Sequence, residues 1–189
     1  MANANGNGDS ELLKRIAAKD RVAVEVLYGR YNVRLYRFIL RLVRNEALAE
    51  ELTNETFMEV WQVAGKFEGR SAASTWIFSI ARNKTISMLR KRSDEELDDE
   101  HTMAIEDDAD TPEVAAQKGH KAALIQACLW RLSDEHREVV DLVYYHEKSI
   151  KEVSEIVGIP QNTVKTRMFH ARKKLSVLMA QVGVDRGWP

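Results

Sequence analysis

The sequence of 189 residues is poor in cysteine and in long apolar runs, and each shortage excludes a class of protein. A single cysteine, Cys128, excludes a disulfide framework within the chain and is typical of a reducing, cytoplasmic compartment. No apolar run approaches transmembrane length, and the N-terminus lacks the apolar core of a signal peptide, so we expect no membrane insertion. The five histidines lack metal-ligand spacing, and no useful stretch alternates as a strand does. We expect an all-α protein without metal or cofactor.

The net charge of −1 conceals a strong segregation of charge along the chain. Residues 22–92 and 121–189 are basic overall, whereas residues 93–120 contain eleven Asp and Glu and one Lys. This pattern predicts two small helical domains joined by a flexible acidic linker at 93–120. We interpret the linker as a solubilising spacer; the alternative is a mimic of nucleic-acid charge. Residues 1–10, rich in Asn and Gly, are expected to form a disordered tail, and residues 179–189 a C-terminal tail.

The stretch from Ser149 to Leu175 has the pattern of two helices joined by a tight turn. Gly158 supplies the conformational freedom that the turn needs, and Pro160 suits the first turn of the second helix. Apolar residues then recur at the spacing of one helix face: Val164, Met168, Ala171 and Leu175. This pattern predicts a helix–turn–helix, and the alternative is an ordinary amphipathic helix of a bundle.

The opposite side of this second helix is basic, with amide, hydroxyl and aromatic groups, and contains no Asp or Glu between Gln161 and Leu175. Lys and Arg neutralise phosphates, whereas amides, hydroxyls and aromatic rings contact base edges and thymine methyl groups. We therefore predict that this helix binds DNA through Gln161, Asn162, Thr163, Lys165, Thr166, Arg167, Phe169, His170, Arg172 and Lys173.

The first basic block predicts helices from about residue 10 to 44, from 46 to 63 and from 75 to 92, with a Gly- and Ser-rich loop at 65–74. Glu51, Glu55 and Glu59 follow one another at helical spacing, but no histidine joins them, so a basic partner surface explains them better than a metal. The loop and the basic helix after it suit single-stranded nucleic acid. Trp76 and Phe78 are either core residues or stacking platforms for bases.

Three segments together resemble a bacterial RNA polymerase sigma factor of the extracytoplasmic-function group, group IV of the sigma-70 family. They are AEELTNETFMEVW (49–61), FEGRSAASTWIFSIARN (67–83) and SIKEVSEIVGIPQNTVKTRMFHARKKL (149–175). The resemblance implies a sigma-2 domain at 11–92 and a sigma-4 domain at 121–178. It also implies an alternative sigma factor, without catalytic chemistry, that binds core RNA polymerase (the β′ clamp helices and the β flap) and promoter DNA, and is controlled by an anti-sigma factor in a stress or envelope response.

The resemblance also implies roles for individual residues, which are expectations at this point. The polymerase-binding residues would be Glu51, Asn54, Glu55, Phe57 and Trp61. The residues that read the −10 element would be Phe67, Arg70, Ser71, Ser74, Trp76, Arg82 and Asn83. The −35 element would be read by the basic helix face at 161–173. This chain departs from the family where Ala73 replaces a frequent aromatic residue and His170 replaces a frequent Arg, so its promoter preference is expected to differ.

Two other functions fit parts of the sequence. A sigma-like decoy would sequester an anti-sigma factor without binding DNA, but a decoy would be expected to lose Lys165, Arg167, Arg172 and Lys173, which this chain keeps. A helix–turn–helix regulator acting without polymerase would leave residues 46–92 unexplained. An enzyme is the least favoured class, because no nucleophile–base pair or metal set can be assembled from these motifs.

Overall fold

The structure, a computed structural model, describes residues 4–98 and 121–183, with side chains for residues 8–93 and 124–183. Every regular element in these ranges is a helix, which confirms the predicted all-α fold. They are α1 (Ala4–Ala17), α2 (Arg21–Val43), α3 (Glu46–Val63), the 3₁₀ helix η1 (Ala64–Lys66), α4 (Ala73–Asp98), α6 (Lys121–Trp130), α7 (Asp134–Tyr144), α8 (Ile150–Val157) and α9 (Gln161–Gln181).

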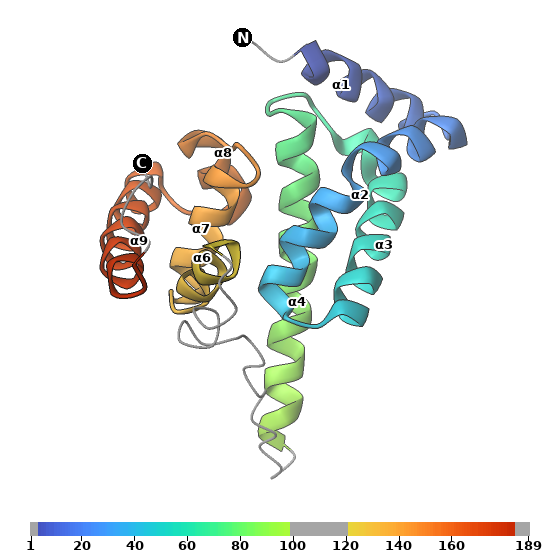
Figure 1. Ribbon diagram of the computed structural model, residues 1–189. Coiled ribbons are helices and arrows are strands. Elements are labelled where there is room, and N and C mark those ends of the chain that lie inside the picture. The colour runs from blue at the N-terminus through green and yellow to red at the C-terminus, as the bar shows by residue number, and fades with distance from the viewer. Residues whose placement is uncertain (1–3, 99–120, 184–189) are drawn as a thin grey trace. The chain divides into compact units, whose positions relative to one another are not determined.

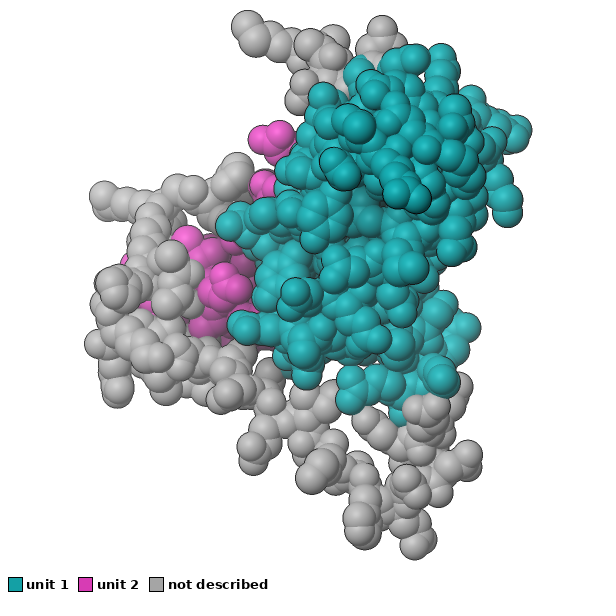
Figure 2. Space-filling view, turned by 90° about the vertical axis from the view of Figure 1, so that its right-hand side faces the viewer, with its two compact units in different colours: residues 1–102, 151–158 teal, residues 103–150, 159–189 magenta. Residues whose placement is uncertain are grey.

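The chain divides into two compact units, which Figure 2 colours separately. The first contains residues 1–102 and 151–158, and the second contains residues 103–150 and 159–189. Helix α8 is thus grouped with the first unit, although its neighbours on both sides in the sequence belong to the second. None of the described helices combines the length and the apolar composition that crossing a lipid bilayer requires.

In the first unit α2, α3 and α4 pack side by side, and α1 lies across one end of this bundle (Figure 1). The core forms where the apolar faces of these helices meet, with the rings of Phe38 and Phe78 5.3 Å apart. Side-chain caps fix the starts of α2 and α3. The Asp20 carboxylate accepts hydrogen bonds from the N–H groups of Val22 and Ala23, and the Asn45 side chain accepts one from Leu48.

Helix α1 begins at Ala4, so the prediction of a disordered tail at 1–10 is wrong for residues 4–10; residues 1–3 lie outside the described range. The reason is Asp9, a residue that is only 3% exposed. It accepts hydrogen bonds from the guanidinium of Arg30 and the hydroxyl of Tyr31, both on α2. A buried carboxylate needs such partners, and they tie the first helix to the bundle. Burial and Asp9 together raise the pKa of the Tyr31 phenol.

Two helices extend past the predicted boundaries. Helix α4 continues to Asp98, six residues into the predicted acidic linker, whose remaining residues from 99 to 120 lie outside the described range. Basic residues at 90–92 precede acidic residues four positions later, a spacing that favours continued helix. Helix α9 continues to Gln181, into the predicted tail at 179–189, because Leu178 and Met179 continue its buried face. Residues 184–189 are not described.

In the second unit α9 packs against α7 and α6. The predicted inner face of α9 is confirmed, because Val164, Met168, Ala171 and Leu175 are all buried. Cys128 on α6 is also buried, as a structural thiol would be, and burial raises its pKa. Ser133 is the N-cap residue of α7, although its side chain makes no capping hydrogen bond.

Candidate functional site

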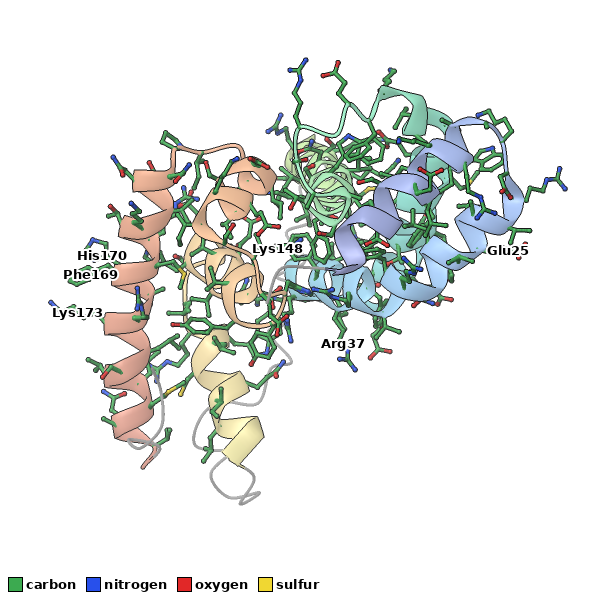
Figure 3. All side chains as sticks on the ribbon, turned by 90° about the horizontal axis from the view of Figure 1, so that it is seen from above. Glu25, Arg37, Lys148, Phe169, His170 and Lys173 are labelled. Atoms are coloured by element: carbon green, nitrogen blue, oxygen red, sulfur yellow. The ribbon has the colours of Figure 1, made fainter. Side chains whose placement is uncertain are left out.

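The outer side of α9 is polar, basic and solvent-exposed. Phe169 is 61% exposed, and Figure 3 shows Phe169 and Lys173 pointing away from α6 and α7. The rings of Phe169 and His170 meet edge to face at 5.4 Å. The other predicted DNA-binding residues that are exposed are Gln161, Asn162, Lys165, Thr166 and Arg172. A cationic helix side with an uncovered aromatic ring has the chemistry needed to contact phosphates and base edges.

Arg167 lies apart from this outer side. Its side chain is 19% exposed, and its Nη2 lies 2.9 Å from Oε1 of Glu135 on α7. Thr163 is half-buried on the same flank of the helix. The structure therefore brings eight of the ten predicted DNA-binding residues to the exposed surface of α9 and directs Arg167 towards α7.

A pair of histidines lies beside Arg167. The rings of His136 on α7 and His170 on α9 are 6.4 Å apart. Burial lowers the pKa of His136, and the neighbouring charges of His170, Arg167 and Lys174 lower it further, against the opposing effect of Glu135. His136 is therefore held towards its neutral form in a cationic surrounding.

The acidic side of α3 is organised by a lysine from the neighbouring helix. The Lys84 ammonium, on α4, lies 3.1 Å from a carboxylate oxygen of Glu59 and 3.4 Å from one of Glu55. Burial acts to lower the pKa of Lys84, but the bonds and charges of Glu59 and Glu55 outweigh it and raise that pKa. These three side chains line a pocket of about 420 Å³ that Asn83 also borders. Among the described side chains, no group of three His, Cys, Asp or Glu is placed to hold a metal.

The five predicted polymerase-binding residues differ in exposure. Glu51 and Asn54 are exposed and Glu55 is half-buried. Phe57 is only 5% exposed, because its ring packs 4.7 Å from that of Tyr28. Trp61 is half-buried beneath the ammonium of Lys19, which lies 5.1 Å from its ring centre. The side of α3 thus combines exposed polar groups with aromatic residues that support them.

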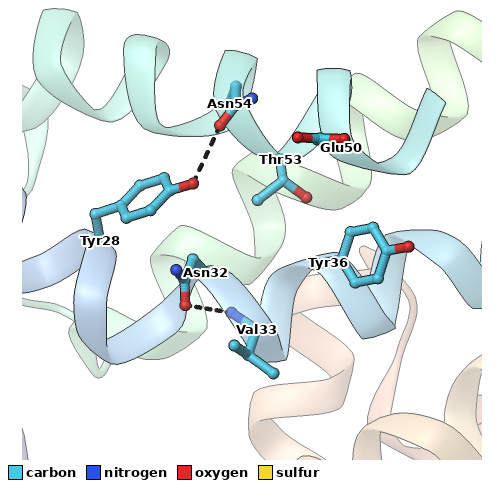
Figure 4. Close-up of a pocket in the computed structure, with 7 residues that line it drawn as sticks. All are labelled: Tyr28, Asn32, Val33, Tyr36, Glu50, Thr53 and Asn54. Carbon is cyan, nitrogen blue, oxygen red and sulfur yellow. Dashed lines mark hydrogen bonds between the residues drawn. The ribbon is translucent and has the colours of Figure 1, made fainter. Parts of the chain in front are cut away.

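A second pocket, of about 330 Å³, lies between α2 and α3 (Figure 4). The hydroxyl of Tyr28 donates a hydrogen bond of 3.3 Å to Oδ1 of Asn54 there. Its lining is Tyr28, Asn32, Val33, Tyr36, Glu50, Thr53 and Asn54.

Tyr28 was missed by the sequence reasoning, as was Met58, which is 64% exposed on α3. An apolar residue among the acids of one helix is the sequence signal that could have identified Met58.

The loop between η1 and α4 holds the predicted −10 residues. Phe67 and Trp76 pack together with ring centres 5.4 Å apart, and both stay partly exposed. Arg70 is exposed and paired with Glu68, whereas Ser71, Ser74 and Arg82 are half-buried and Asn83 is exposed. Phe78 is fully buried and therefore a core residue, whereas Trp76 is half-buried.

Comparisons with known proteins match both halves of the chain. The family described as Sigma-70 region 2 matches residues 27–95, and that described as Sigma-70, region 4 matches residues 122–175. The ECF RNA polymerase sigma factor SigL of Mycobacterium tuberculosis is 31% identical over 177 residues, which cover 90% of this chain and 96% of SigL.

Two further relatives agree with these matches. The ECF RNA polymerase sigma factor SigK of Mycobacterium bovis is 28% identical over 167 residues, which cover 87% of this chain and 89% of SigK. A solved structure of the sigma factor RpoE of Bartonella quintana, in complex with the anti-sigma factor NepR, matches with a TM-score of 0.64 and 26% identity. That match covers 82% of this chain and 96% of RpoE.

Proposed function

Because this chain belongs to the extracytoplasmic-function RNA polymerase sigma factors, we propose that it is a group IV member that directs core polymerase to a narrow set of promoters. The observation that carries the proposal is the outer side of α9, where exposed cations surround an exposed Phe169 on a helix whose opposite face is buried. Such a helix can enter the major groove without disturbing its own core.

In this proposal the two domains have separate tasks. Residues 121–178 form the sigma-4 domain, which binds the −35 duplex. Lys165, Arg172 and Lys173 neutralise phosphates, and Phe169 and Thr166 contact base edges or thymine methyl groups. The phosphate contacts set affinity and register, whereas the base contacts set specificity.

Residues 11–92 form the sigma-2 domain in this proposal. Glu51, Asn54 and Glu55 bind the β′ clamp helices, while the buried Phe57 and the half-buried Trp61 hold α3 in place behind them. The loop from Phe67 to Ser74, with Trp76, Arg82 and Asn83, holds an unstacked base of the melted −10 element. The partly exposed Trp76 offers the stacking surface that such a base needs.

The sigma-4 domain also contacts the β flap, and an anti-sigma factor controls the protein, as the complex of its relative RpoE with NepR supports. The protein acts in the cytoplasm, in a stress or envelope response. It contributes no catalytic group, because the polymerase forms the phosphodiester bonds.

Run-off transcription with purified core polymerase on a genomic promoter library tests this function. We expect a sharp set of new start sites, sharing −35 and −10 elements, only when the protein is added. A folded protein that binds core polymerase but gives no new starts would contradict the proposal. Capture of an anti-sigma factor under those conditions would favour the decoy function.

A further inference from the structure

The contact between Glu135 and Arg167 is not explained by the proposed function, although the inference drawn from it rests on the proposed −35 assignment of α9. Residues 163, 167, 170 and 174 are spaced at four, three and four, so they share one flank of α9, between its buried and outer sides. The first turn of α7 faces this flank, because Glu135 pairs with Arg167 there and the ring of His136 lies beside that of His170.

The charges on this flank are unevenly distributed between the two helices. Arg167 and Lys174 on α9 are cations, and both lower the pKa of His136 on α7, while Glu135 opposes them. The side chain of Glu135 is 67% exposed and that of Arg167 only 19%. The acid therefore lies at the solvent edge, and the arginine is folded back against α7.

We propose that Glu135 is a positioning residue for promoter recognition, which holds Arg167 against α7 and withholds its charge from DNA phosphates. Ion pairs with a solvent-exposed partner are weak, so the carboxylate restrains the guanidinium without burying it permanently. A free arginine at this position would bind the phosphates of any sequence, because phosphate contacts carry no sequence information. Glu135 thus favours promoter DNA by suppressing a contact that every duplex offers.

Salt dependence of DNA binding tests this role, because each phosphate contact on duplex DNA adds about 0.9 to the slope of log K against log salt. Holoenzyme with the full-length chain carrying Glu135→Gln is titrated with a promoter duplex and a scrambled duplex at several salt concentrations. We expect the slope to steepen by about 0.9 on both duplexes. We also expect tighter binding to the scrambled duplex at low salt and a smaller promoter preference.

Three further variants make the result specific. Glu135→Asp keeps the charge and should restore wild-type behaviour. Glu147→Gln removes the same charge from an exposed position in the segment after α7 and should leave the slope unchanged. In an Arg167→Gln background the Glu135→Gln effect should disappear, because the two residues would then act through a single contact.

Three outcomes would overturn the proposal: an unchanged slope, the same steepening in the Arg167→Gln background, or weaker binding to both duplexes with a lower melting temperature. The last would indicate a structural role, since an acid in the first turn of α7 also stabilises that helix. Wild-type holoenzyme without any promoter preference would instead contradict the proposed function itself, so the two failures are distinguishable.

Discussion

The acidic side of α3 and the basic side of α9 carry opposite charges, yet each includes a charged side chain paired with its opposite on a neighbouring helix. On α3, Glu55 and Glu59 share the ammonium of Lys84 from α4. On α9, Arg167 pairs with Glu135 from α7. The two pairings differ in exposure: Lys84 is half-buried between two acids, whereas Glu135 stands mostly in solvent.

This difference separates two uses of an ion pair. Two carboxylates four residues apart on a helix repel each other, and a cation between them keeps both in place for a basic partner. A single exposed acid beside a cationic helix lowers the local positive charge. We propose that the first arrangement prepares a surface for binding and that the second limits what a surface binds.

The largest expected effect comes from reversing a charge on α3. Glu55→Lys places a cation where the proposed partner surface is basic, and like charges at an interface cost several kcal/mol. We expect core polymerase affinity to fall by at least about a hundredfold, measured by co-purification and by titration. Glu25→Lys, at an exposed position on α2 labelled in Figure 3, is the matched control and should bind normally. Normal co-purification of Glu55→Lys would disprove the proposed docking side.

A smaller effect is expected from truncating the exposed ring on α9. Phe169→Ala removes apolar contact with the −35 duplex but disturbs no buried side chain, because Phe169 is mostly exposed. Promoter affinity should fall by about tenfold, or about 1.4 kcal/mol, in a binding titration with holoenzyme. The melting temperature should not change. Val177→Ala, also exposed on α9, is the control; an equal loss in both variants would argue against a specific role for Phe169.

Removing the ammonium of Lys84, which Glu55 and Glu59 share, tests whether this cation prepares α3 for binding. Lys84→Met leaves Glu55 and Glu59 to repel each other, so we expect polymerase affinity to fall by a few-fold while stability changes by less than about 1 kcal/mol. Lys66→Met, in the exposed η1 turn, serves as control in the same titration and in chemical denaturation. Unchanged affinity would mean that Lys84 does not organise the docking side.

The smallest expected effect is a dependence of stability on pH. Because the folded protein lowers the pKa of His136 below its usual 6.5, the unfolded chain binds the proton more readily. The contribution of His136 to stability is therefore complete above pH 6.5 and is lost as the pH falls below it. Chemical denaturation at a series of pH values should show this fall, and His136→Gln should reduce it. An identical pH profile in the variant would exclude His136 as its source.

Local spacing allowed much of the fold to be predicted from the sequence. The helical spacing predicted that Val164, Met168, Ala171 and Leu175 face inward on α9, and all four are buried. Hydrophobic periodicity succeeds here because every residue of one helix face is only three or four positions from the next. The roles assigned to the site residues stay predictions, because they depend on partners outside this chain.

The parts that could not be predicted depend on contacts between residues far apart in the sequence. Asp9, Lys84 and Glu135 each pair with a residue on another helix, and no local pattern identifies the partner. Buried threonines were missed for a second reason. Thr53, Thr56 and Thr85 donate their hydroxyl hydrogens to carbonyls four residues earlier, so residues that count as polar in a hydropathy pattern lie satisfied in the core.

Gly158, between α8 and α9, has a φ of +73° and an exposed position with no neighbouring atom near a would-be Cβ. In a saturation mutagenesis screen, Gly158 would therefore tolerate few substitutions, as a core residue does. The cause would be the backbone angle and not a lack of space for a side chain. Asn, which tolerates left-handed backbone, should be the best accepted replacement, and Val or Ile the worst. Ranking substitutions at this position by size alone would misread a restriction on backbone angle as a restriction on space.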